Sequence, residues 1–347
     1  MARQLSVGLL GCGEAGLRHA AILDDDVPSL VLSGVFDTSA GRCRRLASSH
    51  HVEALPSLEA FFAREFDVVI ICTPNDTHAA LACSALERGS HVILEHPLAL
   101  TNVEAARVCR ASHAHARQLF VVRQRRYSAI AQALRRVVAG GLLGQLEELS
   151  ACILWSRSAA YFLARPWRRD ARSGGVLMNQ ASHFIDLLLY VLGDWVEITG
   201  VRGALRHAVP VEDTAFGVMR FADGAKVDFF FSVACPDGVR DSELMIRGER
   251  GSIRLGGSEW SRIDEWSAPH RPSPGEIASA RGDHREFLER VARRLNGDDV
   301  EVVDASEGAR TVRAIEAFYR ANPIDTRRTA MLIRSRHEHL EPLLAAS

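Results

Sequence analysis

Three glycines near the start of the chain have the spacing of a phosphate-binding turn. The segment LSVGLLGCGEAGLRHAAIL, residues 5–23, predicts a short apolar strand, a tight turn with Gly11, Gly13 and Gly16, and the first turns of a helix. Gly11 allows the sharp turn, Gly13 has no side chain to block a pyrophosphate, and Gly16 lets the helix pack close to the strand. The N–H groups and the positive dipole at the helix N-terminus would then bind phosphates.

A carboxylate that could bind a ribose ends the second predicted strand. The segment VLSGVFD places Asp37 where dinucleotide-binding folds carry an acidic residue. The glycine spacing alone would also fit an ordinary tight turn, but together with Asp37 it favours dinucleotide binding. Asp37 followed by Thr38 favours NAD, because a 2′-phosphate would meet the carboxylate charge, although Arg42 or Arg44 could accommodate NADP.

The first third of the chain alternates strands and helices, which is typical of a doubly wound parallel sheet. The apolar run from Val68 to Cys72 predicts a strand buried on both faces, and HVILEHPLAL supplies another. Ligands on such sheets bind beyond the carboxyl ends of the strands. We therefore expect the cofactor to contact Gly11, Gly13, Glu14, Ala15, Gly16, Asp37, Thr73, Pro74, Asn75, His78, Glu95 and, after the strand from Leu119 to Val122, Arg123.

A second group of polar side chains lies on a mostly apolar helix predicted from Leu177 to Leu192. Asn179, His183 and Asp186 recur at i, i+4 and i+7 and therefore share one stripe of this helix. The stripe could be an ordinary solvated face. We favour a catalytic face directed at the nicotinamide, because a helix this apolar would lie between a sheet and the cofactor domain.

From about Gln145 the pattern changes from alternating strands and helices to strands in succession. The predicted strands begin with LEELSACILW at 146–155 and continue with Val196 to Leu205, Thr214 to Phe221, Lys226 to Val233, Leu244 to Arg247 and Ser252 to Leu255. Helices are predicted near His284 to Leu295 and Ser306 to Arg320. Successive strands indicate an antiparallel sheet. The sequence therefore predicts an α/β Rossmann domain at 1–122 and a C-terminal α+β domain with a mostly antiparallel sheet at 123–347.

Composition limits the possible functions. A formal net charge of -1 argues against nucleic-acid binding, and no apolar run is long enough to span a bilayer. The start of the chain leads straight into a strand, so we expect no signal peptide and a cytoplasmic location. The seven cysteines form no Cys-x-x-Cys pair, so we expect neither a metal site nor disulfides. The single lysine, Lys226, follows an Asp-Gly turn, which argues against lysine chemistry.

Several motifs resemble the Gfo/Idh/MocA family of NAD(P)-dependent sugar oxidoreductases. They are GCGEAG at 11–16, CTPN at 72–75, EHPLA at 95–99 and SGGVLMNQASHFIDLLLYVLG at 173–193, and the similarity reaches about residue 322. Within the family, RSAAYF at 157–162, WRR at 167–169 and LMNQASH at 177–183 resemble enzymes that oxidise C3 of UDP-N-acetylglucosaminuronate. The resemblance implies hydride transfer between nicotinamide and a secondary alcohol or ketone of a sugar or nucleotide sugar. It also implies a homo-oligomer, a dimer or tetramer, assembled through the C-terminal domain.

The resemblance also implies roles for individual residues. His183 would be the general base in oxidation and the acid in reduction, and Asn179 would orient the hydroxyl group. The family typically has Glu-Lys-Pro where this chain has Glu95-His96-Pro97; unlike arginine, histidine can exchange a proton near neutral pH, so His96 is a third catalytic candidate. The predicted substrate contacts are Arg157, Tyr161, Trp167, Arg168, Asn179 and His183.

Two other functions remain open from the sequence. A non-catalytic, cofactor-binding sensor or regulator of the same fold would fit the loss of the lysine at position 96. An imine reductase is the second alternative, because some members of the wider superfamily also lack that lysine. The LMNQASH segment favours a sugar substrate over both.

Overall fold

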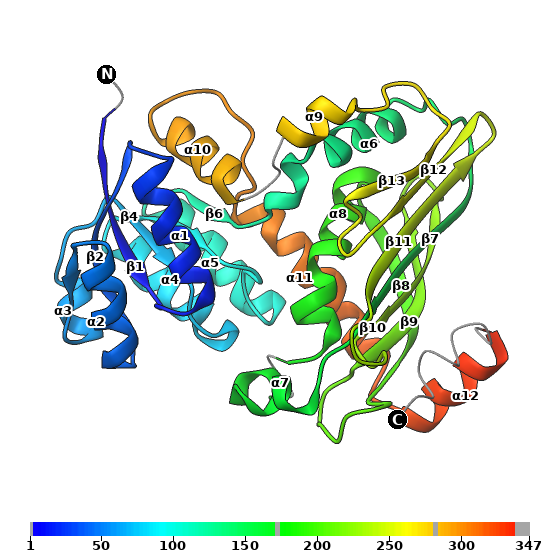
Figure 1. Cartoon of the computed structure of the whole chain (residues 1–347), viewed down its shortest axis with the longest axis horizontal. Coiled ribbons are helices and arrows are strands. Elements are labelled where there is room, and N and C mark those ends of the chain that lie inside the picture. Colours follow the sequence, from blue (N-terminus) through cyan, green and yellow to red (C-terminus); the bar gives the residue numbers. More distant parts are fainter. Residues whose placement is uncertain (1–2, 171–173, 280–283, 337–347) are drawn as a thin grey trace. The chain divides into compact units, whose positions relative to one another are not determined.

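The computed structural model describes residues 3–170, 174–279 and 284–336 (Figure 1). The chain forms two compact units, one of Met1–Ser128 with Ala280–Val312 and one of Ala129–Ser279 with Arg313–Ser347. The sequence places one boundary after Val122. The units therefore differ from the predicted domains in residues 123–128 and 280–312.

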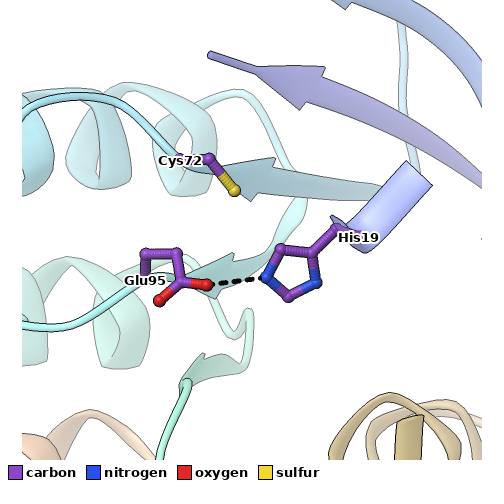
Figure 2. A group of neighbouring side chains, drawn as sticks. All are labelled: His19, Cys72 and Glu95. Carbon is purple, nitrogen blue, oxygen red and sulfur yellow. Dashed lines mark hydrogen bonds and ion pairs between the residues drawn. The ribbon is translucent and has the colours of Figure 1, made fainter. Parts of the chain in front are cut away.

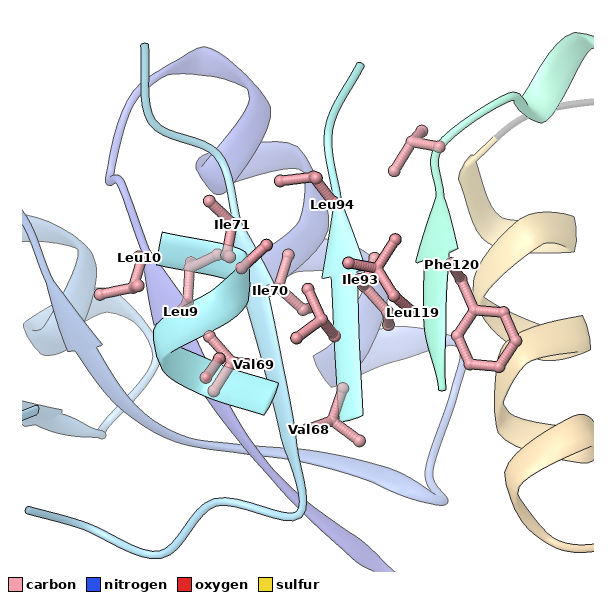
Figure 3. Close-up of a cluster of buried hydrophobic side chains, with 14 of the residues drawn as sticks. Leu9, Leu10, Val68, Val69, Ile70, Ile71, Ile93, Leu94, Leu119 and Phe120 are labelled. Carbon is pink, nitrogen blue, oxygen red and sulfur yellow. The ribbon is translucent and has the colours of Figure 1, made fainter. Parts of the chain in front are cut away.

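The described part of the first unit contains a six-stranded parallel sheet, as the alternating pattern predicts. Its order is β3-β2-β1-β4-β5-β6, with β1 Leu5–Leu10, β2 Leu30–Phe36, β3 Glu53–Ala54, β4 Val68–Ile71, β5 His91–Leu94 and β6 Leu119–Val121. Val69, Ile70 and Ile93 on the central strands are buried, which explains the uninterrupted apolar runs (Figure 3). All the strands run in one direction, so the residues that follow β1, β2, β4 and β5 lie at one edge of the sheet.

The helices of the first unit connect these strands, except η2 and α10, which follow the last strand. They are α1 Glu14–Asp25, α2 Ala40–Ser49, α3 Leu58–Phe62, η1 Asn75–Thr77, α4 His78–Glu87, α5 Asn102–Ala114, η2 Gln124–Tyr127 and α10 His284–Leu295. The start of α5 shows how the sequence fixes a helix boundary. The Thr101 hydroxyl accepts a 3.2 Å hydrogen bond from the Glu104 amide, and the Glu104 carboxylate accepts one of 3.2 Å from the Thr101 amide.

The chain returns to the first unit near its C-terminal end. The Val121 amide donates to the Val303 carbonyl at 2.9 Å, and the Val303 amide donates to the Tyr127 hydroxyl at 3.1 Å. Arg126 forms a 3.0 Å ion pair with Glu307. These bonds attach residues 303–307 beside β6, which is why this late segment belongs to the first unit.

The described part of the second unit contains a seven-stranded sheet in the order β13-β12-β11-β7-β10-β9-β8. The strands are β7 Leu146–Trp155, β8 Trp195–Gly203, β9 Thr214–Phe221, β10 Lys226–Ser232, β11 Arg240–Gly248, β12 Gly251–Gly256 and β13 Arg262–Trp266. Every pairing but one is antiparallel; β7 and β10 are parallel. The predicted mostly antiparallel sheet is therefore confirmed, although the sequence missed β13.

The helices of the second unit carry the predicted catalytic segment. They are α6 Ala129–Ala139, α7 Ala159–Leu163, η3 Pro166–Arg169, η4 Leu177–Ala181, α8 Ser182–Leu192, α9 Pro274–Ser279, the C-terminal part of α11 Ala305–Ala321, and α12 Thr326–Arg336. Among the described residues, no helix combines the length and apolar character that crossing a membrane requires. Ser173, part of the quoted motif, lies outside the described residues.

The segment predicted as one helix from Leu177 to Leu192 is not α-helical throughout. Its first turn, η4, is a π-helix, and only the part from Ser182 onward is α-helical. Asp186 is 2% exposed, whereas Asn179 and His183 are half-buried, so the three side chains do not form a solvated face. A wide π-helical turn alters the angular positions of side chains, so the 3.6-residue period does not hold between Asn179 and His183. His183 and Asp186 both lie in α8 and keep their i, i+3 spacing.

Candidate active site

The three glycines of the turn after β1 differ in whether the fold itself requires glycine at their positions. Gly11 has a φ of +95°, and a Cβ there would lie 2.5 Å from the Cys72 carbonyl oxygen. A Cβ on Gly16 would lie 2.0 Å from the Gly11 carbonyl oxygen. By contrast, a Cβ on Gly13 would meet nothing within 4 Å. The fold thus requires glycine at positions 11 and 16, and the open space at Gly13 fits a dinucleotide phosphate.

Asp37 follows β2 and is already linked to the glycine turn. Its carboxylate accepts hydrogen bonds from the amides of Cys12 at 2.8 Å and Ser39 at 2.7 Å. It also accepts two from Arg42, from Nε at 3.2 Å and Nη2 at 2.7 Å. Burial alone would raise the pKa of Asp37, but the hydrogen bonds from Arg42, Ser39 and Cys12 hold this pKa below its ordinary value. The predicted ribose acceptor, Asp37, is therefore already paired with Arg42.

Replacing Arg42 with alanine is expected to change the choice between NAD and NADP. A 2′-phosphate near Asp37 would lose its neighbouring guanidinium and face an uncompensated carboxylate, whereas NAD brings only hydroxyl groups there. We expect the ratio of the NADP to the NAD dissociation constant to rise about tenfold, which corresponds to about 1.4 kcal/mol. Calorimetric titration with both nucleotides measures this ratio. Arg45→Ala, at an exposed position on the same helix, is the control; equal ratios in both variants would contradict the role of Arg42.

The other predicted cofactor residues differ in accessibility. Gly13, Glu14, Ala15, Thr73 and Pro74 keep accessible surface, whereas Asn75 and Arg123 are 7% and 1% exposed.

His78 is 1% exposed, and both of its ring nitrogens face backbone carbonyls. Nδ1 lies 2.7 Å from the Pro97 oxygen and Nε2 lies 2.9 Å from the Thr73 oxygen. His78 thus joins the loops that follow β4 and β5, which supports a positioning role for this residue.

Glu95, directly after β5, is held by two histidines that the sequence interpretation did not single out. His19 Nε2 lies 2.9 Å from Glu95 Oε1, and His284 Nε2 lies 3.6 Å from the same oxygen. Burial would raise the pKa of Glu95, yet the hydrogen bonds with His19 and His284 keep it well below its ordinary value. Glu95 is therefore a largely shielded carboxylate, 12% exposed, with histidine partners. His19 follows the glycine turn by three residues, but no local signal marks His284.

The Cys72 thiol lies beside this pair (Figure 2). One potential ligand atom each from His19, Cys72 and Glu95 lie within 4.8 Å of one another, and such atoms can bind zinc. However, the histidine and the carboxylate already satisfy each other directly. Burial also raises the pKa of the Cys72 thiol well above its ordinary value, which keeps the thiol neutral. His19 and Glu95 are therefore described by their contacts as a hydrogen-bonded pair, with the neutral Cys72 thiol beside it.

His96 occupies the position of the family lysine and precedes a cis peptide bond to Pro97. Burial, and next the nearby Arg123 guanidinium, lower the pKa of His96 to about 3. The imidazole is therefore neutral at neutral pH and is a poor proton donor there. This lowered pKa does not favour proton exchange by His96 near neutral pH, so the catalytic role of His96 stays a prediction and His183 is the stronger candidate.

The second unit brings most of the predicted substrate residues together. The Arg157 guanidinium lies 4.9 Å from the centre of the Tyr161 ring, and that of Arg168 lies 4.0 Å from it. Arg168 also lies 5.4 Å from the centre of the Trp167 ring. We call Arg157, Tyr161, Trp167 and Arg168 the arginine–tyrosine cluster.

Gln180, which the sequence interpretation missed, connects the arginine–tyrosine cluster to the π-helical turn. Its Nε2 donates a 2.8 Å hydrogen bond to the Tyr161 hydroxyl, and its side chain is 7% exposed. In the same turn, Asn179 Nδ2 donates to the Gly175 carbonyl at 3.2 Å. The predicted substrate contacts and the segment that carries Asn179 and His183 are thus joined within one unit.

Comparisons with known proteins identify both units. The model of the oxidoreductase family with an NAD-binding Rossmann fold matches residues 5–123, and the model of the GFO/IDH/MocA C-terminal domain matches residues 131–254. The scyllo-inositol 2-dehydrogenase (NAD(+)) of Bacillus subtilis is 30% identical over 270 residues, which cover 74% of this chain and 75% of that protein.

Solved structures show the same fold. The WlbA dehydrogenase from Bordetella pertussis, in complex with NADH and UDP-GlcNAcA, has a TM-score of 0.85 at 26% identity and covers 92% of this chain and 96% of its own. WlbA from Chromobacterium violaceum, with the same two ligands, has a TM-score of 0.86 at 26% identity, covering 94% and 95%. Because the two family models together match more than half of the sequence, the chain belongs to the Gfo/Idh/MocA family of NAD-binding oxidoreductases.

Proposed function

We propose that the protein is an NAD-dependent dehydrogenase of a sugar that bears an anionic group, such as a uronate or a nucleotide-linked sugar. The arginine–tyrosine cluster is the observation that carries this proposal. Within residues 3–170, 174–279 and 284–336, the buried Nε atoms of Arg157 and Arg168 have no hydrogen-bond partner. Two guanidinium groups on one aromatic ring, neither with a carboxylate partner in this part of the chain, favour an anionic ligand.

The first unit supplies what a pyridine nucleotide requires. The open space at Gly13 would receive the pyrophosphate, and the Asp37 carboxylate would accept ribose hydroxyl groups. When bound, NAD supplies the acceptor for a hydride from the substrate carbon.

The second unit would supply the acid–base chemistry. During oxidation, the hydroxyl proton of the substrate passes to the His183 imidazole while the C–H hydride leaves the same carbon, so a ketone forms. Asn179 cannot take up a proton at neutral pH, but its amide can orient the hydroxyl group. A homo-oligomer, dimer or tetramer, and a cytoplasmic location complete the proposal; both derive from the sequence resemblance and composition.

Comparing kcat/KM for anionic and neutral substrates tests the proposed function. We expect UDP-GlcNAcA to be oxidised more efficiently than myo-inositol, scyllo-inositol or a methyl D-glucoside. Greater efficiency with any of the neutral alcohols would contradict an anionic substrate.

Replacing Arg168 with methionine is expected to raise KM for the anionic substrate about 10- to 100-fold, with a smaller change in kcat. The magnitude follows from the loss of one charged hydrogen bond, about 1.5–3 kcal/mol. Steady-state kinetics on the purified variant measures it. Arg165→Met removes the same charge at an exposed position nearby and is the control. A KM that is unchanged in both variants would remove Arg168 from the substrate site.

A further inference from the structure

The π-helical turn that precedes His183 begins against a buried carboxylate. Glu212 is 2% exposed, and its Oε1 accepts a 3.2 Å hydrogen bond from the Leu177 amide. Its backbone oxygen accepts a 3.0 Å bond from the Val176 amide. The first amides of a helix have no partner within the helix, so Glu212 satisfies two of them.

Two further side chains complete the cap. The Tyr319 hydroxyl donates to Glu212 Oε1 at 2.7 Å, and Arg202 Nη1 donates to Glu212 Oε2 at 3.1 Å. The Arg202 guanidinium lies 4.1 Å from the centre of the Tyr319 ring. Burial and the Glu212 charge raise the pKa of Tyr319 well above its ordinary value, while a hydrogen bond from the Met178 backbone opposes this change. Two consecutive amides, of Val176 and Leu177, therefore donate to Glu212, whose carboxylate is held by Tyr319 and Arg202.

The backbone beside Glu212 is shaped for this contact. Gly175 has a φ of +90°, and a Cβ there would lie only 2.4 Å from Glu212 Oε1. The carboxylate therefore occupies the space that any other residue at position 175 would fill. The Gly175 carbonyl oxygen also accepts hydrogen bonds from both the amide and the side chain of Asn179, each 3.2 Å long. The cap at Glu212 is thus one residue away from the group that holds Asn179.

The energetics favour a positioning role for this network over a purely stabilising one. Burial raises the pKa of Glu212, and the Arg202 charge opposes this change. The Glu212 carboxylate has therefore lost the water that would solvate it and is hydrogen-bonded to Arg202 and Tyr319 instead. Buried ion pairs often contribute little net stability, because desolvation offsets their attraction. In some proteins buried polar groups instead specify one arrangement of the groups around them, and the contacts of Glu212 fit that role.

We infer that Glu212, supported by Arg202 and Tyr319, is a positioning residue that fixes the π-helical turn and thereby the Asn179 and His183 side chains. The inference rests on the proposed function, in which those two side chains act on the substrate hydroxyl. Glu212 itself is buried, and its effect passes through the backbone of residues 175–178. A displacement of about 1 Å in a reacting group can lower the rate about 100-fold.

Glu212→Gln tests this directly. Glutamine keeps an acceptor for the Leu177 amide but presents an NH₂ group to the Arg202 guanidinium, so the cap cannot form as before. We expect hydrogen–deuterium exchange of amides 176–183 to accelerate at least tenfold. With UDP-GlcNAcA as the probe, we expect kcat to fall about 10- to 100-fold, while KM and the NAD dissociation constant change less than about threefold.

Matched variants decide between the outcomes. Glu197→Gln removes a carboxylate that pairs with Arg220 on the exposed surface of the same unit, and it should leave exchange and kcat unchanged. If Glu212→Gln does not fold, Tyr319→Phe, which removes one hydroxyl group, carries the same test with an expected fivefold loss of kcat. Unchanged exchange and kcat at Glu212, with turnover lost in His183→Ala, would overturn the inference alone. Full turnover in His183→Ala would instead remove the proton-transfer role proposed for His183, and the absence of UDP-GlcNAcA oxidation by the wild-type protein would overturn the proposed function. In both cases the exchange measurement would still show whether Glu212 holds the π-helical turn.

Discussion

Replacing Gly13 with alanine is expected to leave the protein folded and to weaken NAD binding about 10- to 100-fold. A Cβ at this position would meet nothing within 4 Å, and the backbone there is extended, so the fold tolerates a methyl group. The same methyl group would occupy the space proposed for the pyrophosphate. Forcing an extra methyl group into a closely packed contact costs about 1–3 kcal/mol, which gives the stated loss of affinity. Titration with NAD and thermal unfolding measure the two effects.

Two other glycine substitutions separate binding from folding. Gly41→Ala lies within α2, where a Cβ has room, so it should leave NAD binding unchanged and should not destabilise the protein. Gly16→Ala would place a Cβ 2.0 Å from the Gly11 carbonyl oxygen, so we expect it to destabilise the protein itself. Normal NAD affinity in Gly13→Ala would contradict the proposed place of the pyrophosphate.

Replacing His183 with alanine is expected to lower kcat about 1000-fold with little change in the NAD dissociation constant. Proton transfer by a positioned side chain contributes about 10²–10⁴-fold to a rate. The neighbouring candidates cannot compensate for its loss, because Asn179 does not ionise and the pKa of His96 is lowered to about 3. Steady-state oxidation of UDP-GlcNAcA measures the effect.

His113→Ala is the matched control for His183→Ala. His113 lies at an exposed position near the end of α5, so its removal should leave kcat unchanged. A His183→Ala protein that keeps most of its turnover would remove the proton-transfer role assigned to this residue. A large loss of NAD affinity would instead indicate that His183 acts on the cofactor.

The parts of the fold that the sequence predicts well are those that local patterns encode. The run from Val68 to Ile71 is buried on both faces of a parallel sheet, so its apolar residues are continuous and recognisable. The sequence singles out Asp37 as a ribose acceptor and Arg42 as a group that could accommodate NADP, but it does not predict the hydrogen bond between these two residues. The return of residues 280–312 to the first unit has no such local signal, because it depends on partners elsewhere in the chain.

In the candidate site, too, the sequence predicts what a local motif encodes and misses contacts between residues far apart in the chain. The family motif identifies His183 and Asn179, but the side chains that hold their segment come from distant parts of the chain. Glu212 and Tyr319 are 107 positions apart, and neither stands out by its type or spacing. The pKa of His96 depends on burial and on Arg123, which a sequence pattern does not give.

Transfer of a labelled hydride tests the central claim most directly. The protein is mixed with NAD⁺ and UDP-GlcNAcA that carries deuterium on its oxidisable carbons, and the nicotinamide is then analysed by mass spectrometry. We predict that deuterium appears on the reduced nicotinamide with the wild-type protein and is nearly absent with His183→Ala. Tight NAD binding without any labelled or unlabelled NADH, from this substrate or from the inositols and the glucoside, would contradict the account.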